Sequence, residues 1–161
     1  MNFLTTIFSE YLTELIGIPL TLLLNALLVA CEISLIKIRF NHFNTELRNR
    51  VEADKRIGPL FKSGDRTIRV IRFGLTVCLI LYALLIYPLF KSLLNDLEIL
   101  AYGLTTPVSA ILAFTIAVSL HHLICGMLPR AIGLAYPLRS LRIGTPLIVV
   151  FGWISWPVRR L

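Results

Sequence analysis

Apolar residues gather in long runs that are separated by polar, mostly basic segments. The runs without a charged residue are 16–31, 73–90, 99–129 and 143–158. An α-helix needs about 20 apolar residues to cross a hydrocarbon core of ~30 Å. The pattern therefore predicts an all-α integral membrane protein, with residues 1–161 forming a single transmembrane domain. Its three predicted spans lie at about 15–36, 73–90 and 104–125.

The fourth run differs from the other three because Gly and Pro interrupt it and because it is short. Basic residues stand on both sides of it: Arg139, Arg142, Arg159 and Arg160. Both ends therefore prefer the same side of the membrane. We expect an interfacial or re-entrant juxtamembrane helix at about 143–158, with Trp153 and Trp156 at headgroup depth. A true fourth span is the alternative.

The basic residues predict the orientation of the spans. Segment 37–72 contains ten of them: Lys37, Arg39, Arg48, Arg50, Lys55, Arg56, Lys62, Arg66, Arg69 and Arg72. The tail after the third span contains five, and Lys91 alone lies between the second and third spans. Positive loops stay in the cytoplasm. We therefore expect a cytosolic basic loop at 37–72, the N-terminus outside and the C-terminus inside.

Composition narrows the class of protein. Apolar residues make up 57% of the chain, charged residues 16%, and the mean hydropathy is +0.80. Soluble domains are about 45–50% apolar and about 25% charged, so a soluble or disordered chain is excluded. The net charge of +7 follows from topology, and we expect contact with membrane lipid and none with nucleic acid. The expected location is a bacterial inner membrane.

Polar residues inside the predicted spans are candidates for function, because burying them in lipid is costly. Thr21, Asn25 and Glu32 share one face of the first helix by their spacing. Glu32 is a candidate cation ligand or proton carrier, or a group that snorkels towards the cytosolic interface. Asn25 lies deeper, and its alternative role is an interhelical hydrogen bond.

The third span has its own polar face, formed by Thr115, Ser119, His122 and Gly126. We hypothesise a Glu32–His122 pair, because both residues should lie near the same end of their helices, and we expect His121 to point elsewhere. Segment 126–129 ends in Pro129 and is expected to break the helix. Carbonyls freed at such a break are potential cation ligands, and a packing kink is the alternative.

Catalytic signatures are absent from the sequence. It has no Ser/His/Asp constellation, no phosphate-binding loop, no paired carboxylates at catalytic spacing and no cysteine spacing typical of a metal site. We therefore predict that the protein is not an enzyme and has no resident cofactor.

Three segments resemble the transmembrane domain of the cyclin M / CorC family. Asn25–Arg39 is similar to its first-helix motif, Arg72–Thr76 to its Gly-x-Thr motif, and Gly126–Pro137 to its Gly-Glu-hydrophobic-Pro-Lys motif. The resemblance implies divalent-cation transport, with Mg²⁺ as the substrate ion, and a homodimer or a related membrane subunit as partner. By motif position it implies a cation pocket made from six residues: Asn25, Glu32, Ser34, Gly74, Thr76 and Gly126.

Two departures from the family pattern leave two hypotheses open. Met127 stands where the motif has Glu, and its thioether is a poor ligand for Mg²⁺. The 161 residues also hold no pair of the CBS domains that bind ATP in the family, so we expect no ATP-gated regulation from them. The first hypothesis is a divergent cation transporter. The alternative is a transport-inactive scaffold or accessory subunit of the same fold.

Overall fold

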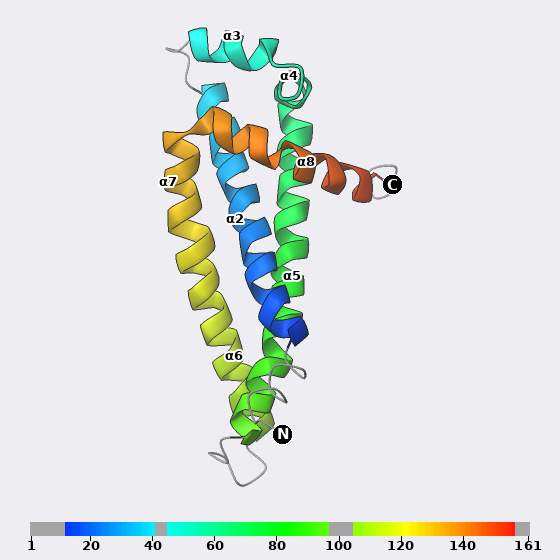
Figure 1. The fold of residues 1–161 in the computed structure, drawn as a ribbon, viewed down its shortest axis with the longest axis vertical. Helices are drawn as coiled ribbons and strands as arrows, with labels where there is room; N and C mark the ends of the chain where they lie inside the picture. Colours follow the sequence, from blue (N-terminus) through cyan, green and yellow to red (C-terminus); the bar gives the residue numbers. More distant parts are fainter. Residues whose placement is uncertain (1–11, 41–44, 97–104, 157–161) are drawn as a thin grey trace.

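The computed structural model describes residues 12–40, 45–96 and 105–156, and within these ranges it contains helices and no strand (Figure 1). The elements are α2 (Leu12–Phe40), α3 (Thr45–Ala53), α4 (Gly58–Lys62), α5 (Gly64–Asp96), α6 (Thr105–His121), the π-helical segment η1 (His122–Met127), α7 (Leu128–Ala135) and α8 (Pro137–Ile154).

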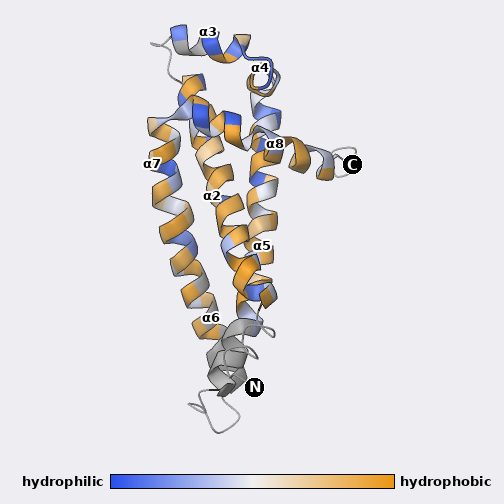
Figure 2. Cartoon of the chain, viewed as in Figure 1, coloured by the Kyte–Doolittle hydropathy of each residue, from blue (hydrophilic) through white to orange (hydrophobic). Residues whose placement is uncertain are grey.

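Three long apolar rods form the bundle. They are α2, α5 and the continuous run of α6, η1 and α7, and α2 contacts both of the others (Figures 1 and 2). By length and composition, three stretches could cross a membrane: Leu12–Phe40, Gly64–Pro88 and Phe114–Ala135. The predicted all-α fold with three apolar spans and a C-terminal helix is confirmed, and its orientation in the membrane stays a prediction. The third stretch ends later than the predicted 104–125, and residue 104 lies outside the described residues.

The third rod does not end where Pro129 was expected to break it. The chain instead widens into the π-helical segment η1 and continues as α7, with Pro129 in the first turn of α7. A proline is tolerated in a first helical turn. The predicted break at 126–129 is therefore wrong. The turn comes at Tyr136, with φ −129° and ψ 61°, because the following Pro137 disfavours a helical conformation there.

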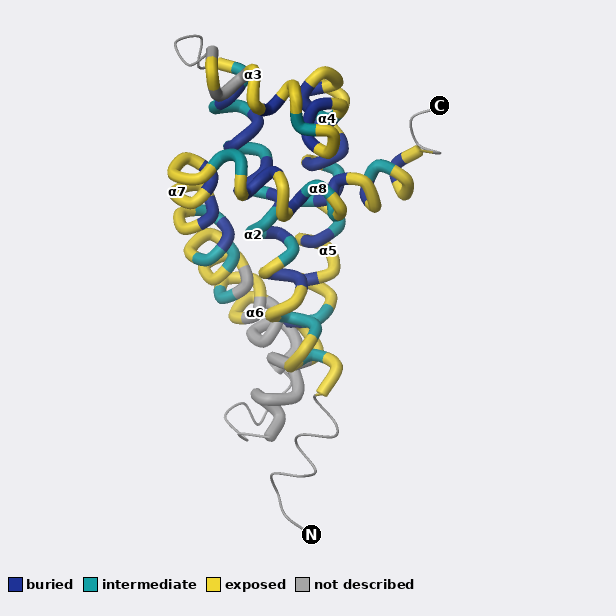
Figure 3. The backbone as a smooth tube through the Cα atoms, turned by 45° about the horizontal axis from the view of Figure 1, so that its top comes forward, coloured by how far each residue is buried: buried dark blue, intermediate teal, exposed yellow. Residues whose placement is uncertain are grey.

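Helix α8 lies across the bundle instead of along it (Figures 1 and 3). Its inner part is buried against α2 and α5 through Ser140, Leu141, Gly144, Ile148 and Phe151. Its outer end projects from the bundle and exposes Trp153 and Trp156. This is the C-terminal helix predicted at 143–158, and it begins earlier, at Pro137. Its depth in a membrane stays a prediction.

Small residues allow α8 to approach the bundle closely. A Cβ added at Gly144 would overlap the sulfur of Cys31, whose Sγ donates a hydrogen bond to the Ser140 carbonyl at 3.2 Å. A Cβ at Gly74 would meet Leu28 at 2.9 Å and Phe151 at 3.0 Å. In lipid, such close backbone packing supplies much of the attraction between helices. Gly74 and Gly144 therefore help fix where α8 crosses.

The basic segment predicted as a loop at 37–72 is mostly helical. Within it, α4 begins at Gly58 and α5 at Gly64. Hydrophilic residues gather on α3, α4 and the first turns of α8, which together form what we call the basic end of the bundle (Figure 2).

One ion pair lies within the basic end, and a second lies beside it, between α2 and α5. Arg142 of α8 donates to Asp54 at 2.8 Å, and Arg39 of α2 donates to Asp65 of α5 at 2.6 Å. Asp54 also accepts from the backbone N–H of Arg56 at 2.9 Å. The Arg142 guanidinium and the backbone N–H of Arg56 hold the pKa of Asp54 below its usual value.

Candidate functional site

Polar side chains of α2 meet the other rods in two layers. The middle polar layer consists of Asn25, Tyr82 and His121. The end polar layer lies nearer the basic end and consists of Glu32, Ser34 and Lys37 with their partners. Asn25 and Glu32 are seven residues apart on one helix, which places the layers about 10 Å apart along its axis.

The middle polar layer holds two buried oxygens without a partner. Asn25 is 3% exposed, and its Nδ2 donates to Nδ1 of His121 at 3.0 Å. The ring of Tyr82 faces the same histidine, with 6.4 Å between the ring centroids. Among the described residues, nothing hydrogen-bonds to Asn25 Oδ1 or to the Tyr82 hydroxyl. Unsatisfied buried oxygens are costly, so this layer has capacity for a ligand.

The histidine assignment made from the sequence is wrong. His121, expected to point elsewhere, faces Asn25, and His122, expected to pair with Glu32, is exposed. Thr115 and Ser119 are exposed as well, so the polar face of the third rod points away from the bundle. Cys125, one turn beyond His121, lies on the inner face, and its Sγ contacts the Leu22 carbonyl of α2.

The end polar layer is well satisfied. Glu32 accepts from Nε of Arg72 at 2.9 Å, and its side chain is 16% exposed against 69% for Arg72. Ser34 donates to the carbonyls of Ala30 at 2.6 Å and Gly133 at 3.1 Å. Lys37 donates to the Leu134 carbonyl. These contacts tie α2 to α5 on one side and to α7 on the other.

Arg72 is the residue that the sequence analysis missed. A signal for it exists: α2 and α5 are antiparallel, so a basic residue at the start of the second span faces the end of the first. Glu32 and Arg72 therefore reach equal depth, and their pairing could have been proposed from topology.

The six residues expected to form a cation pocket have separate surroundings. Asn25 belongs to the middle layer, and Glu32 and Ser34 to the end layer. Gly74 packs under α8, Thr76 is exposed and donates to the Arg72 carbonyl at 3.0 Å, and Gly126 lies in η1 beside His122. Within the described ranges, no cluster of three or more His, Cys, Asp or Glu side chains could hold a metal ion. That these six residues together form one cation pocket stays a prediction.

Comparison with known families decides how this arrangement is classified. The model of the cyclin M transmembrane N-terminal domain matches residues 15–161. The chain belongs to this family. Cyclin M proteins are a membrane divalent-cation transport family and not an enzyme family, so the resemblance found in the motifs is confirmed. Searches of curated proteins and of solved structures found no match.

Proposed function

We propose that the chain transports a divalent cation, with Mg²⁺ as its cargo, along the face of α2 that joins the two polar layers. Membership of the cyclin M family supports the class of activity. Within this chain, the supporting observation is the pair of buried oxygens without partners, Asn25 Oδ1 and the Tyr82 hydroxyl. Oxygen atoms are the ligands that Mg²⁺ prefers.

In this proposal Glu32 supplies the negative charge that neutral oxygens lack. Arg72 now neutralises that carboxylate as an internal counter-ion. Because the Arg72 side chain is 69% exposed, it can move away from Glu32 without displacing neighbouring side chains. A cation moving along α2 would thus pass from Asn25 to Glu32 as the guanidinium withdraws, so that the carboxylate always faces a positive charge.

The expected membrane setting completes the proposal. The basic end would face the cytoplasm of a bacterial inner membrane, following the positive-inside rule. The third rod exposes polar side chains at Thr115, Ser119 and His122. Polar groups are costly in lipid, so a second copy of the chain covering this face in a homodimer fits the observation.

A transport-inactive scaffold is the second candidate, and one observation favours it. Glu32 is already neutralised, and Met127 brings no second carboxylate to the site. Met127 is 66% exposed. With one neutralised carboxylate and neutral oxygens, the site shown is weakly attractive to a divalent ion until Arg72 moves.

The two candidates can be separated in liposomes containing the purified chain and a trapped Mg²⁺ indicator. For a transporter, we expect Mg²⁺ influx in the wild type and a loss of at least about tenfold in Glu32→Gln. Arg72→Gln should lower the Mg²⁺ concentration for half-maximal influx several-fold, because it frees the carboxylate. Glu46→Gln is the matched control, since Glu46 forms an exposed ion pair with Arg50 on α3.

The contrary result is equally specific. If no variant conducts Mg²⁺, while calorimetry shows that Met127→Glu binds Mg²⁺ and the wild type does not, then the fold has kept the architecture of the family without its activity. The scaffold reading would then replace the transport proposal.

A further inference from the structure

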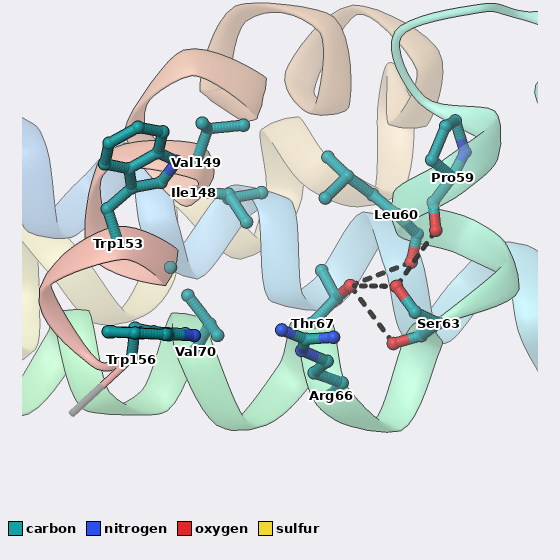
Figure 4. Close-up of a pocket in the computed structure, with 11 residues that line it drawn as sticks. Pro59, Leu60, Ser63, Arg66, Thr67, Val70, Ile148, Val149, Trp153 and Trp156 are labelled. Carbon is teal, nitrogen blue, oxygen red and sulfur yellow. Dashed lines mark hydrogen bonds between the residues drawn. The ribbon is translucent and has the colours of Figure 1, made fainter. Parts of the chain in front are cut away.

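A cavity of about 640 Å³ lies away from both polar layers, between the α4–α5 junction and the outer half of α8 (Figure 4). Ligand pockets commonly have volumes of about 300–1,000 Å³. The lining residues come from two parts of the chain that are far apart in sequence. They are Pro59, Leu60, Ser63, Arg66, Thr67, Val70, Ile148, Val149, Gly152, Trp153 and Trp156.

One wall of the cavity is apolar, and the charged residue of its lining, Arg66, is positive. Val70, Ile148 and Val149 offer hydrocarbon surface, while Arg66 rises from α5 towards the space beside α8 (Figure 4). The hydroxyl of Thr67 is already engaged by the Leu60 carbonyl at 2.8 Å. Asp65, the nearest acid in sequence, is paired with Arg39.

Arg66 is therefore the group through which the cavity can hold an anion. No salt bridge joins Arg66 to any carboxylate in the ranges 12–40, 45–96 and 105–156. A cationic head beside an apolar wall is complementary to a molecule with an anionic head and a hydrocarbon tail.

The position of the cavity matches the membrane surface. Trp153 and Trp156 are 79% and 51% exposed, and tryptophan prefers the headgroup level of a bilayer. Arg66 and Val70 both lie in the first turns of the stretch Gly64–Pro88, which is apolar enough to cross a membrane, and Arg66 is one turn nearer its start. The cavity thus spans from the basic end towards the hydrocarbon region.

We propose that this cavity binds an anionic phospholipid, with the phosphate at Arg66 and the upper part of an acyl chain along Val70, Ile148 and Val149. The bound lipid would fill the space under the outer half of α8 and so support the projecting end of that helix. The proposal is independent of cation transport, because none of these residues belongs to either polar layer.

The chain contains two tryptophans, and both line this cavity. Tryptophan fluorescence therefore reports on the cavity without any label. We would place the full chain in neutral phosphatidylcholine vesicles and titrate in phosphatidylglycerol with brominated acyl chains, which quenches nearby indoles. Brominated phosphatidylcholine in matched vesicles is the reference. We expect half-maximal quenching at an about fivefold lower mole fraction for the anionic lipid. A preference of about this size is what the attraction between anionic lipid and one basic residue near the surface provides.

Three variants test the named contacts. Arg66→Gln should remove the fivefold preference, whereas Arg69→Gln should keep it, because Arg69 lies on the same helix and is exposed but does not line the cavity. Gly152→Leu should reduce quenching by filling the space. A Cβ at Gly152 meets only Val70 Cγ1, at 4.0 Å, so the added side chain starts in open space.

Each contrary result overturns the proposal in its own way. Equal quenching by neutral and anionic lipid would show that no headgroup is selected, and equal losses in Arg66→Gln and Arg69→Gln would show general surface attraction. Protection by inorganic phosphate at millimolar concentration would indicate a site for a soluble anion. Wild-type tryptophans shielded from every brominated lipid would show that protein, such as a second copy, covers the cavity.

Discussion

The two polar layers on α2 use similar side chains in opposite ways. In the end layer, Glu32, Ser34 and Lys37 all have partners on neighbouring helices. In the middle layer, Asn25 and Tyr82 each bury an oxygen that has no partner among the described residues. The end layer therefore looks like a joint between helices, and the middle layer like a place where a ligand or water completes the bonding.

Among buried polar residues, satisfied hydrogen-bonding groups indicate a structural role, and unsatisfied ones indicate a candidate functional role. Ser34 and Asn25 are both almost fully buried on one helix. The Ser34 hydroxyl donates to the Gly133 carbonyl of α7, whereas Asn25 Oδ1 has no hydrogen-bond partner among the described residues.

The closest contact of the end layer should be the least tolerant of change. A Cβ at Gly133 would lie 2.6 Å from the Ala30 carbonyl oxygen, which is backbone and cannot move aside. Gly133→Leu should therefore separate α7 from α2 and lower the free energy of unfolding by about 3 kcal/mol or more. Thermal unfolding in detergent measures the loss.

Gly126→Ala is the matched control on the same rod. Its Cβ would meet no more than the His122 ring, at 3.7 Å, which is an ordinary contact. We expect a change within about 0.5 kcal/mol. Equal losses in the two variants would mean that the close approach at Gly133 does not hold the rods together.

The second prediction compares the two layers directly. Ser34→Ala removes a hydrogen bond to the Gly133 carbonyl and should cost about 1 kcal/mol. Asn25→Leu keeps the branched shape and removes an amide whose oxygen is unpaired, together with its Nδ2 hydrogen bond to His121, so it should cost no more than Ser34→Ala. If Asn25→Leu proves more destabilising in the same unfolding assay, the middle layer is also a structural joint.

The third and smallest effect concerns pH at the basic end. The pKa of Asp54 is lowered in the folded chain, chiefly by Arg142, so the ionised form stabilises the fold. That contribution is complete above the unfolded pKa of about 3.9 and is lost as pH falls through the lower, folded value. The difference in melting temperature between wild type and Asp54→Asn should therefore be constant from pH 7 to 5.

Below about pH 4 the same difference should shrink, because the wild-type carboxylate then becomes protonated. Arg142→Gln should show the same pattern, since Arg142 is the first cause of the lowered pKa. A difference that grows on acidification would contradict this assignment of the ion pair.

Local features of the sequence predicted the fold well. The three spans follow from apolar runs. Each depends on residues close in the chain. The motif Gly-x-x-Pro misled because Pro129 was read as a helix breaker, while the widened turn before it lets the rod continue.

Contacts between helices were harder to predict, because one pattern of polar and apolar residues along a helix is compatible with several ways of packing it against its neighbours. The sequence shows that Thr115, Ser119 and His122 share a face, but not that this face points outward. His121 faces α2 through Asn25, and Cys125 one turn later contacts the Leu22 carbonyl of the same helix. The family motif named candidate ligands, whereas the pairing of Arg72 with Glu32 has to be inferred by combining the motif with the antiparallel topology of α2 and α5.

The π-helical segment η1 gives the third rod a rotational register that an unbroken α-helix would lack. A π turn accommodates one extra residue, and each residue of an α-helix turns the next side chain by about 100°. Deleting a single residue from 122–127 would therefore restore an ordinary α-helix and leave α7 facing as it does. If all the residues were kept in an unbroken α-helix, α7 would instead turn by about a quarter of a circle relative to α6. Gly133 would then face away from Ala30. The six-residue segment η1 therefore sets the rotation of α7 relative to α6 that brings Gly133 against Ala30.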